Sequence, residues 1–282
     1  MNINSIEEYL EPNYYKQLLK DYSFNGVSDT EYLRDFLSQK HAKNILELGC
    51  GSGRATDIAL KVFPNTPITL VDLSERMIAH TKKRFLKIKN ISFIIKDAIF
   101  YLRDTTGQYD LVYSLWSFSH SVHHHIHRLG FEKASMVVYD TLLKFVRKNL
   151  IQGGELFIIH FDSLSPEQRI LMRQWKRVFR EFSDITQQSP SKRMLDKIFL
   201  EMDNHNEVAL SVQHLLGDPI KYKSLEELLE VFMNFHLESF FNKGKLTLKV
   251  LRDITEQVQK YRQNDGSYII NSGCYIYKFI KL

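Results

Sequence analysis

The chain has 282 residues, of which 44% are hydrophobic and 25% are charged, and its formal net charge is +5. This length predicts one large domain, or one domain that carries a sizeable insertion. Two cysteines, Cys50 and Cys274, exclude a disulfide framework and a cysteine-only zinc site. The N-terminus lacks the basic start and apolar run of a signal peptide, and the longest apolar runs fall short of the roughly 20 residues that cross a bilayer. We therefore expect a soluble, cytoplasmic protein.

Short apolar runs alternate with amphipathic stretches in the first half of the chain, which is the pattern of strands and helices on a parallel sheet. The runs are rich in Ile, Leu and Val, as expected of strands that are covered on both faces. The predicted strands are Asn44–Leu48, Ile68–Asp72, Ile91–Lys96, Tyr109–Ser114 and Glu155–His160. A helix is predicted over residues 75–86, with Ser74 as its N-cap, and Gly153-Gly154 predicts a turn before the fifth strand.

The pattern changes after Asp162 and predicts a helical insertion in the α/β core at residues 163–223. Ser165-Pro166-Glu167 is typical of a helix start, and a second helical pattern surrounds residues 194–202. A further helix, a strand at Phe235–Phe241, a helix and a last strand at Cys274–Ile280 are then expected. The predicted parts are an N-terminal helical lid (1–43), a cofactor-binding core (44–162), an insertion that forms a substrate lid (163–223) and the C-terminal part of the core (224–282).

Most of the net charge lies in one segment of the predicted insertion. Residues 165–200 hold eight basic and four acidic side chains, a net charge of +4. Such a patch attracts an anionic partner, or is a solvated helix face. The sequence leaves both interpretations open.

A glycine-rich loop follows the first predicted strand, in Glu47-Leu48-Gly49-Cys50-Gly51-Ser52-Gly53. Glycines at such a place allow a tight turn and let a ligand approach the backbone without meeting a Cβ. The second predicted strand ends at Asp72, nineteen residues after Gly53. A carboxylate there can accept hydrogen bonds from both hydroxyls of a ribose. Together the two features predict a ligand that contains a nucleoside.

The glycine spacing decides between classes of nucleoside ligand. A dinucleotide fingerprint, G-x-G-x-x-G, would need a glycine where Arg54 stands. The chain also lacks the G-x-x-x-x-G-K-S/T phosphate loop. The loop therefore need not hold a pyrophosphate, and the acidic Glu47 before it suits a cationic ligand.

These motifs resemble those of the class I S-adenosylmethionine-dependent methyltransferases. The loop from Glu47 to Gly53 is similar to the family's first motif, and the acid Asp72 to the residue that binds the ribose hydroxyls. Lys96-Asp97-Ala98 resembles the motif whose Asp recognises the adenine amino group. The strand at Tyr109–Ser114 and the turn at Gly153-Gly154 resemble the fourth strand and the turn into the fifth. The five motifs stand in the family's order.

The resemblance implies a Rossmann-like seven-stranded sheet with an antiparallel last strand, a helical insertion or lid after strand 5, and S-adenosylmethionine as cofactor. It also implies a set of residues that bind this cofactor, all of them in or beside the motifs. They are Glu47, Gly49, Gly51, Gly53, Asp72, Leu73, Met77, Asp97, Ala98 and Ser114.

A cluster of histidines follows the fourth strand, where the family fold places the methyl group. Five of the eleven histidines lie within residues 120–127. One interpretation is a polar loop or helix start without special chemistry. Another is a general base or a group that hydrogen-bonds to the substrate, and His120 and His123 are favoured because they lie nearest the strand. If the base has the pKa of an unperturbed imidazole, the rate should fall below about pH 6.5 as the base becomes protonated. Metal binding lacks a nearby carboxylate to complete the set, so we predict no metal.

Other candidate residues are assigned to the substrate. The resemblance implies an N-terminal helix that covers the cofactor with an aromatic side chain, for which Tyr14 and Tyr15 are candidates. Trp116 and His160 follow or end strands that carry the site, and Arg173 and Arg177 lie in the basic segment. A tyrosine-rich surface helix and a hydrogen-bonded core histidine are the alternatives.

The sequence thus predicts a methyltransferase that acts at nitrogen or oxygen of a small molecule or short peptide. The basic segment favours an anionic substrate. The Asp/Asn-Pro-Pro-aromatic motif is absent after the fourth strand, and neither cysteine has the place of a pyrimidine C5 nucleophile. These absences disfavour a nucleic-acid substrate. The alternatives are an RNA methyltransferase that uses residues 165–200, and a binding protein that has lost the chemistry.

Overall fold

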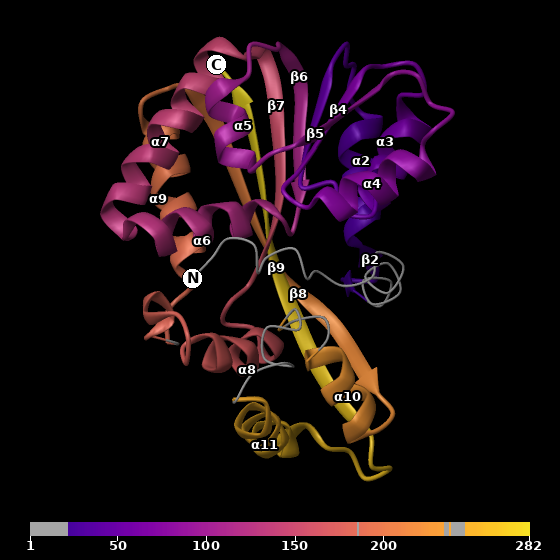
Figure 1. The fold of residues 1–282 in the computed structure, drawn as a ribbon, viewed down its shortest axis with the longest axis vertical. Coiled ribbons are helices and arrows are strands. Elements are labelled where there is room, and N and C mark those ends of the chain that lie inside the picture. Colours follow the sequence, from indigo (N-terminus) through magenta and orange to yellow (C-terminus); the bar gives the residue numbers. More distant parts are fainter. Residues whose placement is uncertain (1–21, 185, 234–236, 238–245) are drawn as a thin grey trace. The chain divides into compact units, whose positions relative to one another are not determined.

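A computed structural model describes residues 22–184, 186–233, 237 and 246–282 (Figure 1). The candidate lid residues Tyr14 and Tyr15, and all of the predicted strand Phe235–Phe241 except Leu237, lie outside the described residues. The chain divides into two compact units. The core unit comprises residues 29–160, 189–214 and 275–282, and the accessory unit comprises the described residues of 1–28, 161–188 and 215–274.

Five parallel strands form the centre of the core unit, in the order β5-β4-β3-β6-β7. The strands are β3 (Ile45–Leu48), β4 (Ile68–Asp72), β5 (Ile91–Ile95), β6 (Tyr109–Leu115) and β7 (Leu150–Phe161). All five predicted strands are confirmed within one or two residues, except that β7 begins earlier. Gly153 and Gly154 lie inside β7, where Gly153 has a φ of 71° and the register with β6 shifts between the pairs Tyr109–Leu150 and Leu111–Glu155, so the predicted turn is an irregularity within the strand. The chain leaves β3 for β4 on one side and returns to β6 on the other, which makes β3 the point where the strand order reverses.

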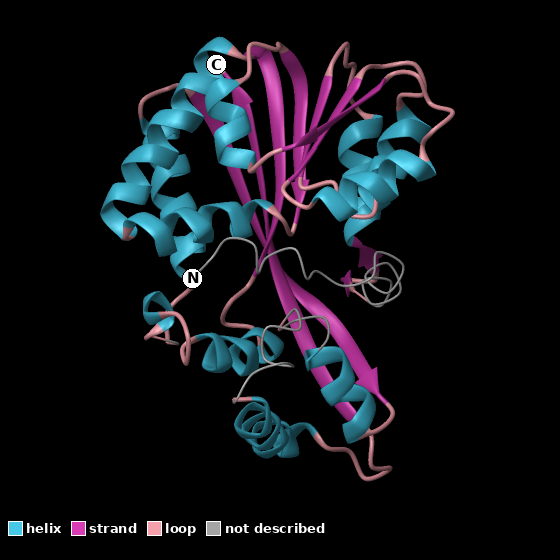
Figure 2. Ribbon diagram, viewed as in Figure 1, coloured by secondary structure: helices cyan, strands magenta, loops and turns pink. Residues whose placement is uncertain are grey.

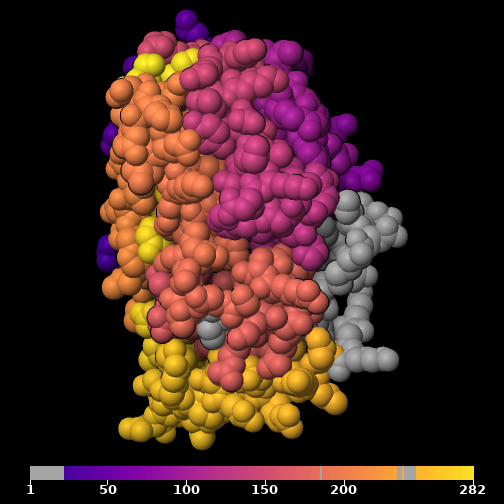
Figure 3. Space-filling model, turned by 90° about the vertical axis from the view of Figure 1, so that its left-hand side faces the viewer, coloured from indigo at the N-terminus to yellow at the C-terminus, as the bar shows by residue number. Residues whose placement is uncertain are grey.

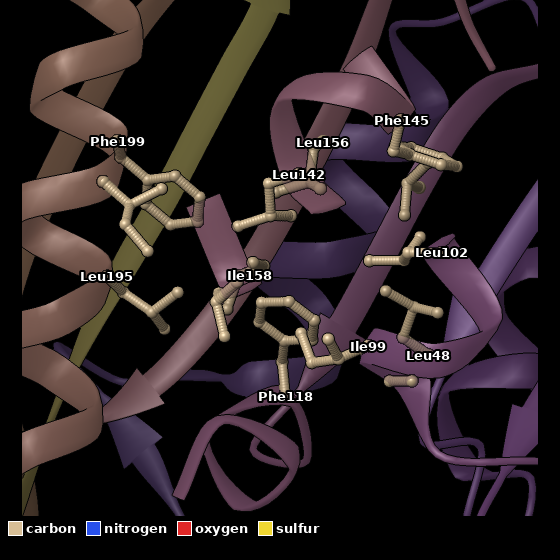
Figure 4. Packing of buried hydrophobic residues seen from close by; sticks show 14 of the residues in the cluster. Leu48, Ile99, Leu102, Phe118, Leu142, Phe145, Leu156, Ile158, Leu195 and Phe199 are labelled. Carbon is tan, nitrogen blue, oxygen red and sulfur yellow. The ribbon is translucent and has the colours of Figure 1, made fainter. Parts of the chain in front are cut away.

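Four further strands extend the sheet to nine among the described residues, in the order β2-β1-β8-β9-β7. The sheet has the predicted α/β, Rossmann-like class, with two short strands, β1 (Ser23–Phe24) and β2 (Val27–Ser28), beyond the seven that the sequence predicts. β9 (Tyr268–Lys281) lies between β7 and β8 (Val208–Tyr222). Figure 4 shows β9, the yellow strand of Figure 1, pointing opposite to β7, so the antiparallel last strand is confirmed. The predicted insertion is corrected at 208–222, which form β8 rather than helix. Strand pairing within the sheet outweighs the local pattern of this segment.

Helices cover both faces of the core sheet (Figure 2). Within the described part of the chain, one face carries three helices and the other carries four. The first group is α2 (Asp29–Ser38), α3 (Arg54–Val62) and α4 (Glu75–Arg84); the second is α5 (Ala98–Asp104), α6 (Phe118–Leu129), α7 (Phe131–Lys148) and α9 (Pro190–Asn204). Ser74 caps α4 through Met77 N, as its sequence predicts. Figure 3 shows α7 and α9 side by side on the outer surface of this unit.

The main hydrophobic cluster joins the second group of helices to the sheet (Figure 4). α9 contributes Leu195, Ile198 and Phe199, which pack with Leu156 of β7 and Phe279 of β9. Residues 189–204 therefore belong to the core unit, although the sequence assigns them to a lid. The correction has a simple cause, because α9 buries one whole apolar face against this cluster.

The accessory unit combines short strands with helices. Its elements are β1 (Ser23–Phe24), β2 (Val27–Ser28), α8 (Pro166–Trp175), the 3-10 helix η3 (Arg180–Phe182), α10 (Leu225–Val231), α11 (Thr247–Val258) and the 3-10 helix η5 (Gln259–Tyr261), together with the adjoining parts of β8 and β9. The predicted start of α8 is confirmed, since Ser165 accepts a hydrogen bond from Gln168 N and Pro166 is the first helical residue. In the described part of the chain, no helix is long and apolar enough to span a membrane.

The place of α9 in the core can be tested with two neighbouring residues. Phe199 is fully buried, with its ring centroid 5.3 Å from that of Tyr277 and 5.5 Å from that of Phe279. We expect Phe199→Ala to lower the free energy of unfolding by about 3–5 kcal/mol, because it leaves a cavity. Leu200→Ala, at a side chain 55% exposed, should cost less than about 0.5 kcal/mol. Urea unfolding gives both values, and equal losses would contradict this packing.

Candidate active site

The candidate site is built where β3, β4 and β6 end at the same edge of the sheet. After β3 the backbone turns through three glycines with positive φ angles, 76° at Gly49, 50° at Gly51 and 78° at Gly53. Gly49 N donates to Val71 O of the neighbouring strand over 2.7 Å. Because side chains rarely adopt these angles, the sequence needs glycine here to make the turn.

The three glycines differ in what surrounds them. A Cβ at Gly49 would lie 1.9 Å from Ser117 Oγ, and one at Gly53 would lie 2.6 Å from the Phe85 ring. A Cβ at Gly51 would meet no atom within 4 Å. Gly49 and Gly53 are therefore required by packing inside the protein, whereas Gly51 presents bare backbone to open space. That is the arrangement that lets a ligand approach a loop closely.

Asp72 ends β4 beside this loop. Its Oδ2 accepts a hydrogen bond from Gly51 N over 2.8 Å, and its Oδ1 accepts one from Ser74 N over 2.9 Å. Burial raises the pKa of Asp72, and these backbone N–H groups counteract part of that effect. Each carboxylate oxygen has a second lone pair, so Asp72 can still accept hydrogen bonds from ligand hydroxyls.

Glu47 is buried at the end of β3. Its Oε2 accepts hydrogen bonds from Thr56 Oγ1 over 2.6 Å and from the Tyr113 hydroxyl over 2.8 Å. Burial raises the pKa of Glu47 to about 7, although both hydrogen bonds lower it. Near neutral pH the carboxyl group of Glu47 is thus partly protonated and partly ionised, and a nearby cation would favour the ionised form.

Asp97 caps α5 and interacts with a residue that the sequence reasoning missed. Its Oδ1 accepts from Phe100 N over 3.1 Å and lies 3.2 Å from Nε2 of His125. Burial raises the pKa of Asp97, but the hydrogen bonds from His125 and Phe100 outweigh it and leave that pKa below its usual range. His125 stands 28 residues away in the sequence, so no local pattern could have paired it with Asp97.

Ser114 and Trp116 shape the end of β6. Ser114 Oγ donates to Leu48 O over 2.6 Å and accepts from Phe118 N over 3.2 Å, so it ties the end of β6 to β3 and to α6. Trp116 has a φ of 66°, a left-handed conformation that a bulky residue rarely adopts. Such strain costs on the order of 1–3 kcal/mol and is typical of functional sites.

The histidine cluster forms part of α6, which begins at Phe118. Burial, together with its histidine neighbours, lowers the pKa of His123 to about 3, whereas the side chain of His120 is exposed. The expectation of an unperturbed imidazole is therefore wrong for His123, whose ring is neutral at pH 7. A neutral imidazole can accept a proton or a hydrogen bond. Among the described residues no group of three or more His, Cys, Asp or Glu side chains could hold a metal ion.

The remaining candidates are distributed over both units. In the core unit, the buried His160 lies 3.3 Å from Ser191 Oγ through its Nε2. Met77 is buried in α4, and Leu73 is partly exposed. In the accessory unit, Arg173 and Arg177 both approach Asp253, over 3.6 Å and 3.3 Å. The two arginines hold α8 against α11, and their substrate role stays a prediction.

Comparison with known proteins places this site in a family. Residues 45–139 match the family model described as a methyltransferase domain. They hold the glycine loop, Asp72, Asp97 and the whole of α6. Residues 45–139 are a class I S-adenosylmethionine-dependent methyltransferase domain.

Curated relatives with the higher identities match short parts of the chain. A malonyl-[acyl-carrier protein] O-methyltransferase of Ilyobacter polytropus is 39% identical over 75 residues, which are 27% of each chain. One from Bacillus cereus is 42% identical over 65 residues, 23% of this chain and 24% of its own length. The matches thus span about a quarter of the length of these relatives. One from Halalkalibacterium halodurans is 25% identical over 79% of this chain and 76% of its own length.

Solved structures of the same fold extend over more of the chain. The YcgJ protein of Bacillus subtilis has a TM-score of 0.53 at 15% identity, over 89% of this chain and 97% of its own. A Haemonchus contortus phosphoethanolamine N-methyltransferase in complex with S-adenosylhomocysteine has a TM-score of 0.51 at 16% identity, over 96% of this chain and 56% of its own. S-adenosylhomocysteine is the demethylated form of S-adenosylmethionine, the cofactor of this family.

Gly51 offers a direct test of the ligand-facing backbone. Gly51→Ala should weaken S-adenosylmethionine binding at least about tenfold, because the methyl group enters the open space where the ligand approaches. Gly266→Ala is the matched control, since Gly266 also has a positive φ, 83°, and no atom near its Cβ position. Both changes should cost about 1–2 kcal/mol of stability through backbone strain. Calorimetric titration that finds equal affinity in the two variants would contradict the site.

Proposed function

We propose that this chain transfers a methyl group from S-adenosylmethionine to nitrogen or oxygen of a small molecule or short peptide. The observation that carries the proposal is the bare backbone of Gly51, which faces open space beside Asp72 inside a methyltransferase domain. Two carboxyl groups, Asp72 and Glu47, flank the loop, and these suit a ligand that has a ribose and a positive charge.

Three carboxyl groups of the core unit bind different parts of the donor. Asp72 accepts hydrogen bonds from the ribose hydroxyls, and Glu47 supplies negative charge on the side of the cationic methionine part. Asp97, whose pKa is held low by His125, stays ionised and accepts from the adenine amino group. When bound, the cofactor supplies a methyl group on a positively charged sulfur.

The acceptor side depends on the end of β6 and on α6. Methyl transfer is an in-line displacement, so the protein must align the acceptor and exclude water. His123 is neutral at pH 7 and can accept a hydrogen bond that orients an amine or hydroxyl acceptor, although its low pKa makes it a weak base. The exposed His120 is the candidate to take the proton that the acceptor loses as its new bond to carbon forms. Trp116 forms a wall of the acceptor site.

A carboxylate acceptor is the second candidate, favoured by the relatives named malonyl-[acyl-carrier protein] O-methyltransferases. A carboxylate is already deprotonated at pH 7 and needs no base. The two candidates therefore differ in their need for the α6 histidines. An assay of S-adenosylhomocysteine formation decides between them, with malonyl-acyl carrier protein, short peptides and small amines as acceptors. If the protein binds the donor but turns over none of these acceptors, it is a binding protein and not an enzyme.

The histidines give the first pH prediction. His123→Gln should lower turnover of an amine or hydroxyl acceptor about 100-fold, with donor affinity nearly unchanged. Because the pKa of His123 is about 3, this histidine should impose no loss of wild-type rate between pH 8 and about pH 5. His127→Gln, at an exposed residue of the same helix, is the control. Steady-state rates measure both effects, and normal turnover in both variants would assign the cluster to the scaffold.

Glu47 gives a second pH prediction, because burial raises the pKa of this carboxyl group, whereas it lowers the pKa of a histidine. Its folded pKa of about 7 lies above the usual 4.5, so the stability that it contributes is present below pH 4.5 and is lost as pH rises through 7. A bound cation favours the ionised form, so donor binding should release a proton from Glu47. The part of the affinity that depends on Glu47 should then rise about tenfold from pH 6 to pH 8.

Calorimetry in buffers of different ionisation enthalpy counts the released protons. Glu47→Gln should abolish the contribution of Glu47, while the amide oxygen still accepts from Thr56 or Tyr113. Any ionisation of the donor itself is common to both proteins and cancels in the difference. Equal proton release by wild type and variant at pH 6.5 would show that Glu47 does not sense the donor.

A further inference from the structure

A buried carboxylate lies at the start of α2, outside the residues that the family model matches. Asp29 is fully buried, and four N–H groups donate to it. Arg54 Nη1 donates to Oδ1 over 2.7 Å and Arg54 Nη2 to Oδ2. Trp116 Nε1 donates to Oδ2 over 2.6 Å, and Thr30 N to Oδ1 over 2.7 Å. Both oxygens are thus satisfied by partners that come from three different segments.

The burial of this charge depends on those partners. A carboxylate removed from water is unfavourable unless a counter-charge and hydrogen bonds replace its hydration. The guanidinium of Arg54 provides both in a two-pronged contact, and the N-terminus of α2 adds its partial positive charge. The carboxylate is therefore held in one place, and it holds its donors in turn.

Two of those donors come from the two segments that border the proposed methyl-transfer site. Arg54 is the first residue of α3 and follows Gly53 of the glycine loop directly. Trp116 follows β6 directly, and the next residue, Ser117, is packed against Gly49. Asp29 therefore links the loop that binds the donor to the segment that faces the acceptor.

The backbone of Trp116 shows why its side chain needs an anchor. With a φ of 66°, this residue is in a conformation that indole side chains rarely adopt. Its N donates to Ile159 O over 2.9 Å, and its carbonyl oxygen accepts from Ser119 Oγ over 3.0 Å. These bonds fix the main chain, and the bond from Nε1 to Asp29 fixes the direction of the ring.

We propose that Asp29 is a positioning residue that aims the indole of Trp116 across the acceptor side of the methyl-transfer site. The role of that site rests on the proposed function, whereas the effect of Asp29 on Trp116 does not. The donor loop has other supports, since Gly51 N donates to Asp72, Thr81 Oγ1 donates to Gly51 O over 2.7 Å, and Arg84 Nη1 donates to Ser52 O over 2.7 Å. Loss of Asp29 should therefore disturb Trp116 much more than donor binding.

Tryptophan fluorescence tests the proposal without an acceptor. The chain has two tryptophans, so Trp175→Phe leaves Trp116 as the sole reporter. In that background, Asp29→Ala should raise the acrylamide quenching constant of Trp116 at least about threefold, because the indole loses its acceptor and becomes accessible to the quencher. Asp35→Ala, at an exposed acid of the same helix, should leave the constant unchanged.

Asp29→Asn provides the milder variant, because the amide oxygen still accepts one hydrogen bond. We expect an intermediate quenching constant from it, and it decides the question if Asp29→Ala does not fold. S-adenosylhomocysteine affinity, measured by calorimetry in the same proteins, should fall less than about threefold.

Two outcomes would overturn the proposal. If every folded Asp29 variant has the same quenching constant as the Asp35 control, the carboxylate of Asp29 does not fix the direction of the indole. A loss of S-adenosylhomocysteine affinity greater than about tenfold would instead make Asp29 part of the donor site. Failure of the wild type to bind S-adenosylhomocysteine at all would contradict the proposed function, and the quenching comparison would still decide the role of Asp29.

Discussion

The pairing of β3 with β4 on one side and with β6 on the other is the constraint on which the site depends. The ladders place Leu48 opposite Val71 and Glu47 opposite Tyr113, so the ends of all three strands meet at one edge. A shift of one residue in either ladder would turn Glu47 or Asp72 to the other face of the sheet. Gly49 N donates to Val71 O of β4, so the position of the glycine loop is fixed by the register between β3 and β4.

Charge is buried at this edge in three different ways. Glu47 has no cationic partner within hydrogen-bonding distance among the described residues, and burial therefore raises its pKa to neutrality. Asp72 is held by backbone N–H groups, and Asp29 by a guanidinium and an indole. Only Glu47 is left to respond to a cation that arrives from outside. The protein thus keeps one carboxyl group uncompensated where the proposed ligand is positive, and satisfies the others internally.

Much of the core could be predicted from the sequence because its signals are local. Buried parallel strands are recognisable as short apolar runs. The glycine loop and the acid at the end of the next strand have a spacing that is typical of this fold. The errors have a common cause in contacts between distant residues. β8 is a strand because it completes a sheet, α9 joins the core through β7 and β9, and His123 has a depressed pKa because of what surrounds it. The partners of Asp29 lie 25 and 87 residues away, beyond the reach of any local pattern.

A crystal structure of the protein with S-adenosylhomocysteine would locate the bound donor. We expect the ligand to lie against the bare backbone of Gly51, with its ribose hydroxyls hydrogen-bonded to Asp72 and its amino acid part on the side of Glu47. The indole of Trp116 should remain bound to Asp29 next to the sulfur. A ligand that lies elsewhere, or that leaves the carboxylate of Asp72 without a hydroxyl partner, would contradict the account.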